Sequence, residues 1–366
     1  MARIINQVAV FGLGKVGELV AVMLGESGFK VVGYDAAPRE TALNEVGSFE
    51  IRPLDVKDAE GLRESLRGVD AVVSCLPYHL NIDVAEAASD AGTHYFDLTE
   101  DVPTTNRVIE LAAAGGVTSA FAPQCGLAPG LIGIIGASLA KTFEEIRSIE
   151  LKVGALPQNP TGLLGYAFNW SAEGVVNEYL NDCEVLRSGH RQMVPAMTEK
   201  ERVFIGGIEL EAALTSGGLG TMCETYESTV HRLDYKTLRY PGHFDQMHFL
   251  FDELNLRDQR ELVGTMLVDA KPPVNDDIVY IHAAVEGRKN GQPFRENYVR
   301  GYKPLEINGR TWRAISWTTA ASAVSVVELV AEGVLPAAGF IKQEDISLEQ
   351  LFSTQAGSHF ATLGEV

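Results

Sequence analysis

The sequence has little cysteine, and no two of its cysteines have the CxxC spacing of a metal or redox motif. Cys75, Cys125, Cys183 and Cys223 are spread over 366 residues. Cysteines this sparse argue against a disulfide framework and a zinc site, and they are typical of thiols kept reduced in the cytosol. We therefore expect a cytoplasmic protein.

Long apolar runs and an excess of basic charge are also absent. The most apolar stretch, Leu131–Ala140, is much shorter than the roughly 18 apolar residues of a membrane span. The first apolar run breaks into glycines instead of forming the core of a signal peptide. Lys and Arg number 30 against 49 Asp and Glu, a net charge of −19. Because nucleic-acid binding depends on neutralising phosphates, we expect neither a nucleic-acid nor a membrane partner.

Two kinds of catalytic site are missing as well. His94, His231, His248, His282 and His359 have no spacing to carboxylates that is typical of a metal site. The Gly-x-Ser-x-Gly motif of α/β-hydrolases is absent. We therefore expect no bound metal and no hydrolase of that kind.

What the sequence does contain is an alternation of short apolar runs and helical patterns over its first 125 residues. Such runs are typical of strands buried in a parallel sheet, and their alternation with helices is typical of a doubly wound α/β domain. The expected strands are Gln7–Phe11, Lys30–Tyr34, Ala71–Ser74, Tyr95–Leu98 and Val117–Phe121, and the expected helices are Lys15–Glu26, Ala59–Arg67, Ile82–Ala91 and Thr104–Ala114.

After Gly130 the pattern changes to that of an α+β domain. A strand is expected at Ile146–Val153, and the dipeptides Asn290-Gly291 and Asn308-Gly309 indicate antiparallel hairpins. Helical patterns occupy 131–141, 171–180, 252–268 and 318–332. At about 150 residues per domain, the length fits two domains, placed at 1–125 and 126–330, followed by a C-terminal segment at 331–366.

The first expected strand runs directly into a glycine pattern that opens a helix. In a dinucleotide-binding turn the first glycine allows the tight bend, the second lets the backbone approach the pyrophosphate, and the third lets helix and strand pack closely. The helix N-terminus then offers N–H groups to the phosphates. We expect the nucleotide to contact Gly12, Leu13, Gly14, Lys15, Val16 and Gly17.

Asp35 ends the second expected strand, 18 residues after Gly17. A carboxylate at this place accepts hydrogen bonds from the ribose hydroxyls and repels a 2′-phosphate, which favours NAD over NADP. The alternative for Asp35 is an ordinary helix cap at a strand end. Arg39, four residues further on, would tolerate a phosphate.

Later strand ends are expected to line the same crevice, because open α/β sheets bind ligands beyond the carboxyl ends of their strands. His79 is either a polar group of that crevice or an exposed residue at the start of a helix. The other expected contacts are Asp55 and Val56 beside the adenine, and Cys75, Leu76 and Pro77 under the nicotinamide ribose.

Eight further segments follow in an order that resembles the saccharopine dehydrogenase family. They are SCLPYHLN, HYFDLTED, PQCGLAPG, VGALPQNP, FNWSAEGVVNEY, TSGGLGT, TLRYPGH and GFIKQEDISL. Within the family the likeness is greatest to the bacterial lysine 6-dehydrogenase branch, which oxidises the side-chain amine of lysine with NAD. One departure from the saccharopine-forming relatives is Ala128 in GLAPG, where they usually carry an acidic residue.

The resemblance implies a Rossmann domain and a catalytic, dimer-forming domain similar to that of glyceraldehyde-phosphate dehydrogenases, with the last helices returning to the first domain. It also implies a homodimer with a small amino-acid substrate. Arg239 is similar in position to an arginine that contacts the substrate carboxylate in the relatives, and Trp170 to a tryptophan of their pocket wall. The alternatives are a surface salt bridge for Arg239 and a core position for Trp170.

The candidates for proton transfer are Asp97, His243 and His79. Asp97 lies at the end of the expected strand Tyr95–Leu98 and is the acidic group best placed to meet an amine, although it could instead orient a backbone turn. His243 follows Arg239 by four residues. It is either a proton carrier of the same pocket or a helix-start residue without chemistry.

Three more residues are expected near the substrate. Thr99 belongs to the loop after the expected strand Tyr95–Leu98, in which Glu100 and Asp101 are expected to cap a helix. Cys125 lies in the loop between the two domains, where it contacts substrate or is simply packed, and nothing nearby would make it a thiolate nucleophile. Tyr240 is either a pocket wall or a core residue.

The resemblance and the dinucleotide pattern together favour an NAD-dependent dehydrogenase acting on the ε-amine of L-lysine. Its products would be ammonia and 2-aminoadipate 6-semialdehyde, which closes to a piperideine carboxylate. One alternative is a saccharopine- or carboxynorspermidine-type dehydrogenase acting on a secondary amine, and Ala128 counts against it. Another is a non-catalytic dinucleotide-binding sensor, and the set of Asp97, Trp170, Arg239 and His243 counts against that.

Overall fold

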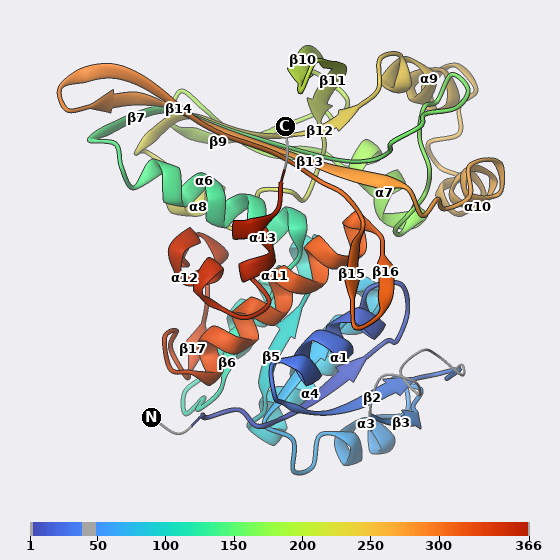
Figure 1. The fold of residues 1–366 in the computed structure, drawn as a ribbon, viewed down its shortest axis with the longest axis vertical. Helices are drawn as coiled ribbons and strands as arrows, with labels where there is room; N and C mark the ends of the chain where they lie inside the picture. The colour runs from blue at the N-terminus through green and yellow to red at the C-terminus, as the bar shows by residue number, and fades with distance from the viewer. Residues whose placement is uncertain (1–2, 39–48, 365–366) are drawn as a thin grey trace. The chain divides into compact units, whose positions relative to one another are not determined.

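The structure is a computed structural model that describes residues 3–38 and 49–364, so Arg39 lies outside the described residues. The chain forms two compact units, Met1–Ile134 with Ser316–Thr362 and Ile135–Ile315 with Leu363–Val366. The first unit therefore continues beyond residue 125 and takes up the chain again before residue 331. Each unit has its own large sheet (Figure 1).

A seven-stranded parallel sheet forms the centre of the first unit. Six of its strands have the order of a dinucleotide-binding Rossmann domain, and one edge strand is added. This confirms the predicted doubly wound α/β domain. In order across the sheet, the strands are β3 (Glu50–Pro53), β2 (Lys30–Asp35), β1 (Gln7–Phe11), β4 (Ala71–Ser74), β5 (His94–Asp97), β6 (Ala120–Ala122) and β17 (Gly339–Phe340).

The helices between these strands begin at acidic caps in two cases. The carboxylates of Asp58 and Asp101 accept hydrogen bonds from the N–H groups of Glu60 and Thr104, which satisfies donors that the first turn leaves free. The predicted cap at Asp101 is thereby confirmed. The connecting helices are α1 (Gly17–Glu26), α3 (Ala59–Ser65), η1 (Tyr78–Leu80), α4 (Asn81–Ala91) and α5 (Val102–Ala112).

The C-terminal part of the chain supplies the edge strand β17 of the first unit. The N–H groups of Gly339 and Ile341 donate to the carbonyls of Ser119 and Phe121, at 3.0 and 2.9 Å. Among the described residues, α11 is the one helix long and apolar enough to cross a membrane, and 89% of its most apolar window is buried, as in a core helix. The elements here are α11 (Ala314–Ala331), η4 (Gln343–Asp345), α12 (Leu348–Ser353) and α13 (Ser358–Thr362).

The second unit is built on a mixed eight-stranded sheet, as expected of an α+β domain. β7 pairs in parallel with β12 and antiparallel with β13. The Asn290-Gly291 hairpin joins β13 to β14, and Asn308-Gly309 joins β15 to β16; positive φ at each of these residues suits a tight turn. The strands are β7 (Glu145–Pro157), β8 (Cys183–Arg187), β9 (His190–Val194), β10 (Glu201–Ile205), β11 (Ile208–Leu214), β12 (Val230–Arg239), β13 (Asp277–Lys289) and β14 (Gln292–Tyr302), with β15 (Leu305–Ile307) and β16 (Arg310–Trp312) apart.

An apolar core lies where the helices of the second unit pack on this sheet. Leu156 and Leu238 from the strands join Val176 of α7, Phe244 of α9 and Val263 of α10 in one buried cluster. The helix predicted at 252–268 is wrong in its first turns, because residues 254–259 form turns between η3 and α10, which begins at Arg260. The helices are α6 (Ile132–Ala140), α7 (Ala172–Leu180), α8 (Met222–Tyr226), α9 (His243–His248), η3 (Phe249–Glu253) and α10 (Arg260–Ala270).

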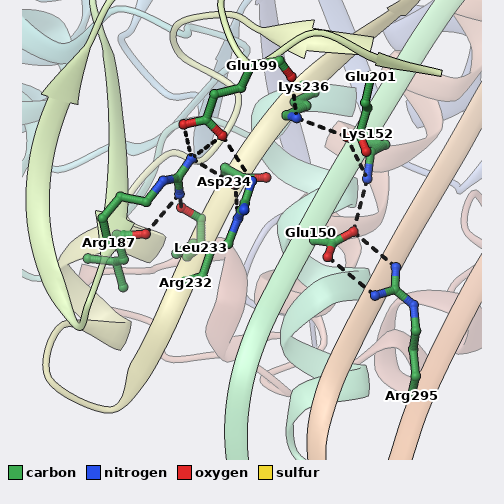
Figure 2. A network of polar contacts seen from close by, with 11 residues as sticks. Glu150, Lys152, Arg187, Glu199, Glu201, Arg232, Leu233, Asp234, Lys236 and Arg295 are labelled. Carbon is green, nitrogen blue, oxygen red and sulfur yellow. Dashed lines mark hydrogen bonds and ion pairs between the residues drawn. The ribbon is translucent and has the colours of Figure 1, made fainter. Parts of the chain in front are cut away.

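The same face of this sheet also carries a network of ion pairs. Lys152 and Lys236, only 3% and 4% exposed, lie 3.4 and 3.0 Å from Glu201. Glu150 pairs with both Lys152 and Arg295, at 3.2 and 3.0 Å (Figure 2). Because each of the cations lies within ion-pair distance of a carboxylate, this network holds strands together. Its other members are Arg187, Glu199, Arg232 and Asp234.

Candidate functional site

The turn after β1 has the backbone that a dinucleotide needs. Gly12 adopts a φ of 85°, and its N–H donates to the Tyr34 carbonyl at 2.8 Å. A Cβ on Gly17 would lie 1.8 Å from the Gly12 oxygen, so only glycine permits this contact between turn and helix. A Cβ on Gly14 would meet nothing within 4 Å, which leaves open space where a pyrophosphate would approach α1. The residues present therefore fit a dinucleotide.

Asp35 lies at the end of β2, beside this turn. One of its carboxylate oxygens accepts the Leu13 N–H at 2.8 Å, and the other accepts the Ala37 N–H at 2.9 Å. Each carboxylate oxygen has a further lone pair, so the group can still accept ribose hydroxyls. Lys15 is exposed, and Val16 is the residue before α1.

The loop after β3 contributes less than expected. Asp55 is exposed and accepts a hydrogen bond from the Lys57 N–H. The Val56 side chain lies in the hydrophobic core with Leu54, so a contact to the nucleotide would have to come from its backbone.

The loop after β4 meets the glycine turn, at the place where the strand order reverses. The Cys75 N–H donates to the Phe11 carbonyl at 2.8 Å, and a Cβ on Gly12 would come within 3.0 Å of both Cys75 and Leu76. Burial, with the charge of Asp97, raises the pKa of Cys75 to about 12, so the thiol stays protonated. Pro77 and His79 are exposed, and the His79 ring lies edge-on to Tyr78.

Asp97, at the end of β5, is fully buried and serves as an acceptor for the chain itself. It accepts hydrogen bonds from the Tyr95 hydroxyl at 2.7 Å and from the N–H groups of Thr99 and Gln124, both at 2.9 Å. Burial raises its pKa despite these bonds. The carboxylate therefore fixes the loops after β5 and β6, and the Thr99 hydroxyl continues this role by accepting the Asp101 N–H.

Cys125 is also buried in the loop after β6. Its thiol donates to the Ala122 carbonyl at 2.9 Å, and burial with the nearby Asp97 raises its pKa well above the usual value. Gln343 from η4 donates to the Pro123 carbonyl and lies 3.3 Å from the sulfur. Cys125 has no exposed surface that a ligand could contact. Its contact with Gln343 could not be predicted from the neighbouring sequence, because the two residues are 218 positions apart.

In the second unit, Arg239 ends β12 inside a cage of aromatic rings. It is 2% exposed. Its Nε donates to the Tyr179 hydroxyl at 2.7 Å, and Nη1 donates to the Leu238 carbonyl at 2.9 Å. The guanidinium carbon lies 4.5 Å from the centre of the Tyr166 ring, and Nη2 lies 4.0 Å from Glu178 Oε2. Arg239 is therefore not in a surface salt bridge.

His243 completes a hydrogen-bond chain that runs in one direction only. Its Nδ1 lies 2.9 Å from the Leu164 carbonyl, which can only accept, so Nδ1 carries the proton. The unprotonated Nε2 then accepts from the Tyr179 hydroxyl at 2.9 Å, and Tyr179 accepts from Arg239. Burial, and the charge of Arg239, lower the pKa of His243 to about 3. His243 is thus neutral and orients Tyr179.

Trp170 and Tyr240 lie near this chain but bind different partners. The Trp170 indole donates to the Tyr166 hydroxyl at 3.1 Å, and its ring occupies the space that a Cβ on Gly174 would fill. Tyr240 donates to the Pro157 carbonyl at 2.9 Å. Both are half-buried.

The structure brings Arg239, His243 and Trp170 together through two residues that the sequence reasoning missed, Tyr166 and Tyr179. Glu178 was also missed. The available signal was the segment FNWSAEGVVNEY, in which Glu178 and Tyr179 stand two helical turns after Trp170. Among residues 3–38 and 49–364, no group of three or more His, Cys, Asp or Glu could hold a metal ion.

Comparison with known proteins agrees with both units. Residues 8–119 match the family model of the saccharopine dehydrogenase NADP binding domain, and residues 126–354 match that of the saccharopine dehydrogenase C-terminal domain. The chain also has the fold of an apo saccharopine dehydrogenase (L-Glu forming) from Saccharomyces cerevisiae, with a TM-score of 0.77 at 16% identity over 97% of both chains.

Two curated relatives are similar over part of their sequences. Both are saccharopine dehydrogenases [NADP(+), L-glutamate-forming]. The protein from Schizosaccharomyces pombe is 26% identical over 58% of this chain and 49% of its own length, and that from Pyricularia oryzae is 26% identical over 50% and 42%. The chain thus matches about half the length of these relatives.

Proposed function

Because the chain belongs to the saccharopine dehydrogenase family, an oxidoreductase family with a pyridine-nucleotide-binding domain, we propose that it oxidises the ε-amine of L-lysine with NAD. In the overall reaction lysine, NAD⁺ and water give 2-aminoadipate 6-semialdehyde, NADH, ammonium and a proton. We further propose a homodimer in the cytoplasm.

The observation that carries the proposal is the caged guanidinium of Arg239. It is buried and held at Nε and Nη1, so its position is fixed before a substrate arrives. A planar guanidinium is suited to bind a carboxylate, and such bonds are strong where water is excluded. This supports an amino acid as the substrate. The half-buried ring of Trp170 supplies an apolar wall for the lysine methylenes.

Asp35 supports NAD as the nucleotide. Its carboxylate is held by two backbone N–H groups beside the glycine turn. There it can accept ribose hydroxyls and would repel a 2′-phosphate. The names of the two curated relatives specify NADP(+), so NADP is the alternative nucleotide that an experiment must compare with NAD.

The buried residues of the chain position the substrate and do not exchange protons with it. A nicotinamide held at the glycine turn would supply the acceptor for the hydride of the ε-carbon. Water then adds to the resulting iminium, and the carbinolamine breaks its C–N bond to release ammonia. Arg239 holds the carboxylate throughout, and His243 stays neutral, since its pKa is about 3. We propose His79, the exposed candidate, as the proton carrier.

A substrate screen tests the proposal. Purified protein is given NAD or NADP with L-lysine or saccharopine, and both the reduced nucleotide and the nitrogen product are measured. We expect reduction of NAD with L-lysine, with one ammonia released per hydride transferred.

The screen also tests a second candidate that the names of the relatives favour, an L-glutamate-forming saccharopine dehydrogenase. Reduction of NADP with saccharopine and release of glutamate would assign that activity instead. Nucleotide binding without turnover of any amine would indicate a dinucleotide sensor.

A further inference from the structure

Glu178 is the negative charge inside the aromatic cage of Arg239. The side chains of Arg239 and Glu178 are 3% and 9% exposed, and their nearest atoms, Nη2 and Oε2, are 4.0 Å apart. A direct charge-assisted hydrogen bond between the two groups would be about 2.7–2.9 Å long. The observed distance of 4.0 Å is longer, so Arg239 and Glu178 face each other without a direct hydrogen bond between Nη2 and Oε2.

The spacing of Nη2 and Oε2 fits an α-amino acid head group that lies against the pair. The ammonium nitrogen and the nearer carboxylate oxygen of an amino acid are about 2.7 Å apart, as covalent geometry dictates. If the oxygen accepts from Arg239 and the nitrogen donates to Glu178, each at about 2.8 Å, four atoms form a trapezoid. Its long side is the 4.0 Å between Nη2 and Oε2.

Charge balance points to the same ligand. The cage holds one cation, one carboxylate and the neutral His243. A zwitterionic head group leaves this balance unchanged. A carboxylate without the amine would add an uncompensated negative charge next to Glu178, and burying an unpaired charge is costly.

We propose that Glu178 binds the α-ammonium of the substrate while Arg239 binds its α-carboxylate, so that the cage selects free α-amino acids. This inference rests on the proposed function. Tyr179 and His243 assist by fixing Nε of the guanidinium, and the Leu238 carbonyl holds Nη1, which leaves Nη2 for the ligand.

The rival explanation is that Glu178 only balances the charge of Arg239. Both explanations predict that Glu178→Gln weakens the site. They differ in what the substitution does to a ligand that has the carboxylate and lacks the α-amine, such as 6-aminohexanoate.

The test measures binding by calorimetry, so that it does not depend on turnover. L-lysine and 6-aminohexanoate are titrated into wild-type protein, Glu178→Gln and Glu173→Gln, a matched control that removes an exposed carboxylate from the same helix. We expect wild type and the control to prefer lysine by about 10- to 100-fold, the worth of one charge-assisted hydrogen bond. In Glu178→Gln the preference should fall to near one.

Three outcomes would overturn the inference. They are equal losses for both ligands in Glu178→Gln, no preference for lysine in wild type, and no binding of lysine to wild type. The second and third need no variant, so a variant that fails to fold does not weaken the test. Binding of lysine with the expected preference but without reduction of NAD would overturn the proposed function and leave the α-amino-acid site standing.

Discussion

Lowering the pH from 7 to 5 should destabilise the second unit through His243. The imidazole is buried against Tyr179, Tyr166 and Phe244, close to the charge of Arg239. Burial first, and the cation second, lower its pKa from 6.5 to about 3. In the unfolded chain the same group takes up a proton with a pKa of about 6.5.

Between pH 7 and 5 the unfolded state therefore binds a proton that the folded state does not. Stability rises with pH wherever the unfolded state binds more protons, so the contribution of His243 is lost as the pH falls below about 6.5. With pKa values of about 6.5 in the unfolded chain and about 3 in the folded chain, protonation over this range costs about 2 kcal/mol of unfolding free energy.

Urea unfolding at pH 7, 6 and 5 measures this slope. In His243→Gln, where residue 243 does not titrate, the free energy of unfolding should fall by about 2 kcal/mol less than in wild type. The other histidines are present in both proteins, so their effects cancel. His190→Gln removes an exposed histidine of the same unit and should leave the wild-type slope unchanged. Parallel curves for wild type and His243→Gln would refute the argument.

The remaining predictions concern the nucleotide turn and the charged sheet face. Asp35→Ala should weaken NAD relative to NADP by about 10-fold, one hydrogen bond to a charged group, and equal dissociation constants before and after would contradict the ribose contact. Gly17→Ala should lower the melting temperature without nucleotide, because its Cβ has no room, whereas Gly14→Ala should lower only nucleotide affinity. Burial raises the pKa of Glu150, but the hydrogen bonds and charges of Arg295 and Lys152 together outweigh it, and the pKa is about 2. Between pH 5 and 3 the free energy of unfolding of wild type should therefore fall by about 2 kcal/mol more than that of Glu150→Gln, as measured by acid unfolding.

Local sequence patterns were sufficient where a strand is buried on both faces. β1 and β4 were predicted to the residue, because a central parallel strand must be apolar throughout. β3, with the sequence EIRP, was missed because it is a largely exposed edge strand. β9 was missed for the same reason, since nearly all of its side chains face solvent.

The chemistry of the sites depends on contacts that no local pattern contains. Tyr179, which holds the Arg239 guanidinium, is 60 residues away in the sequence. Gln124, which donates to the Asp97 carboxylate, is 27 residues away. A sequence can place a carboxylate at a strand end, but only the packed loops show that backbone donors already occupy it.

These contacts change where the proton chemistry of the proposed reaction can reside. Asp97 and His243 are buried, and each is engaged in hydrogen bonds that accepting a proton would break. A neutral amine loses hydride far more readily than an ammonium, so with both groups withdrawn the ionisation of the substrate amine should govern turnover. Activity should then rise steadily toward alkaline pH. If His79 carries the proton, His79→Gln should lower kcat with little change in the Michaelis constant for lysine, and an unchanged kcat would assign the step to solvent.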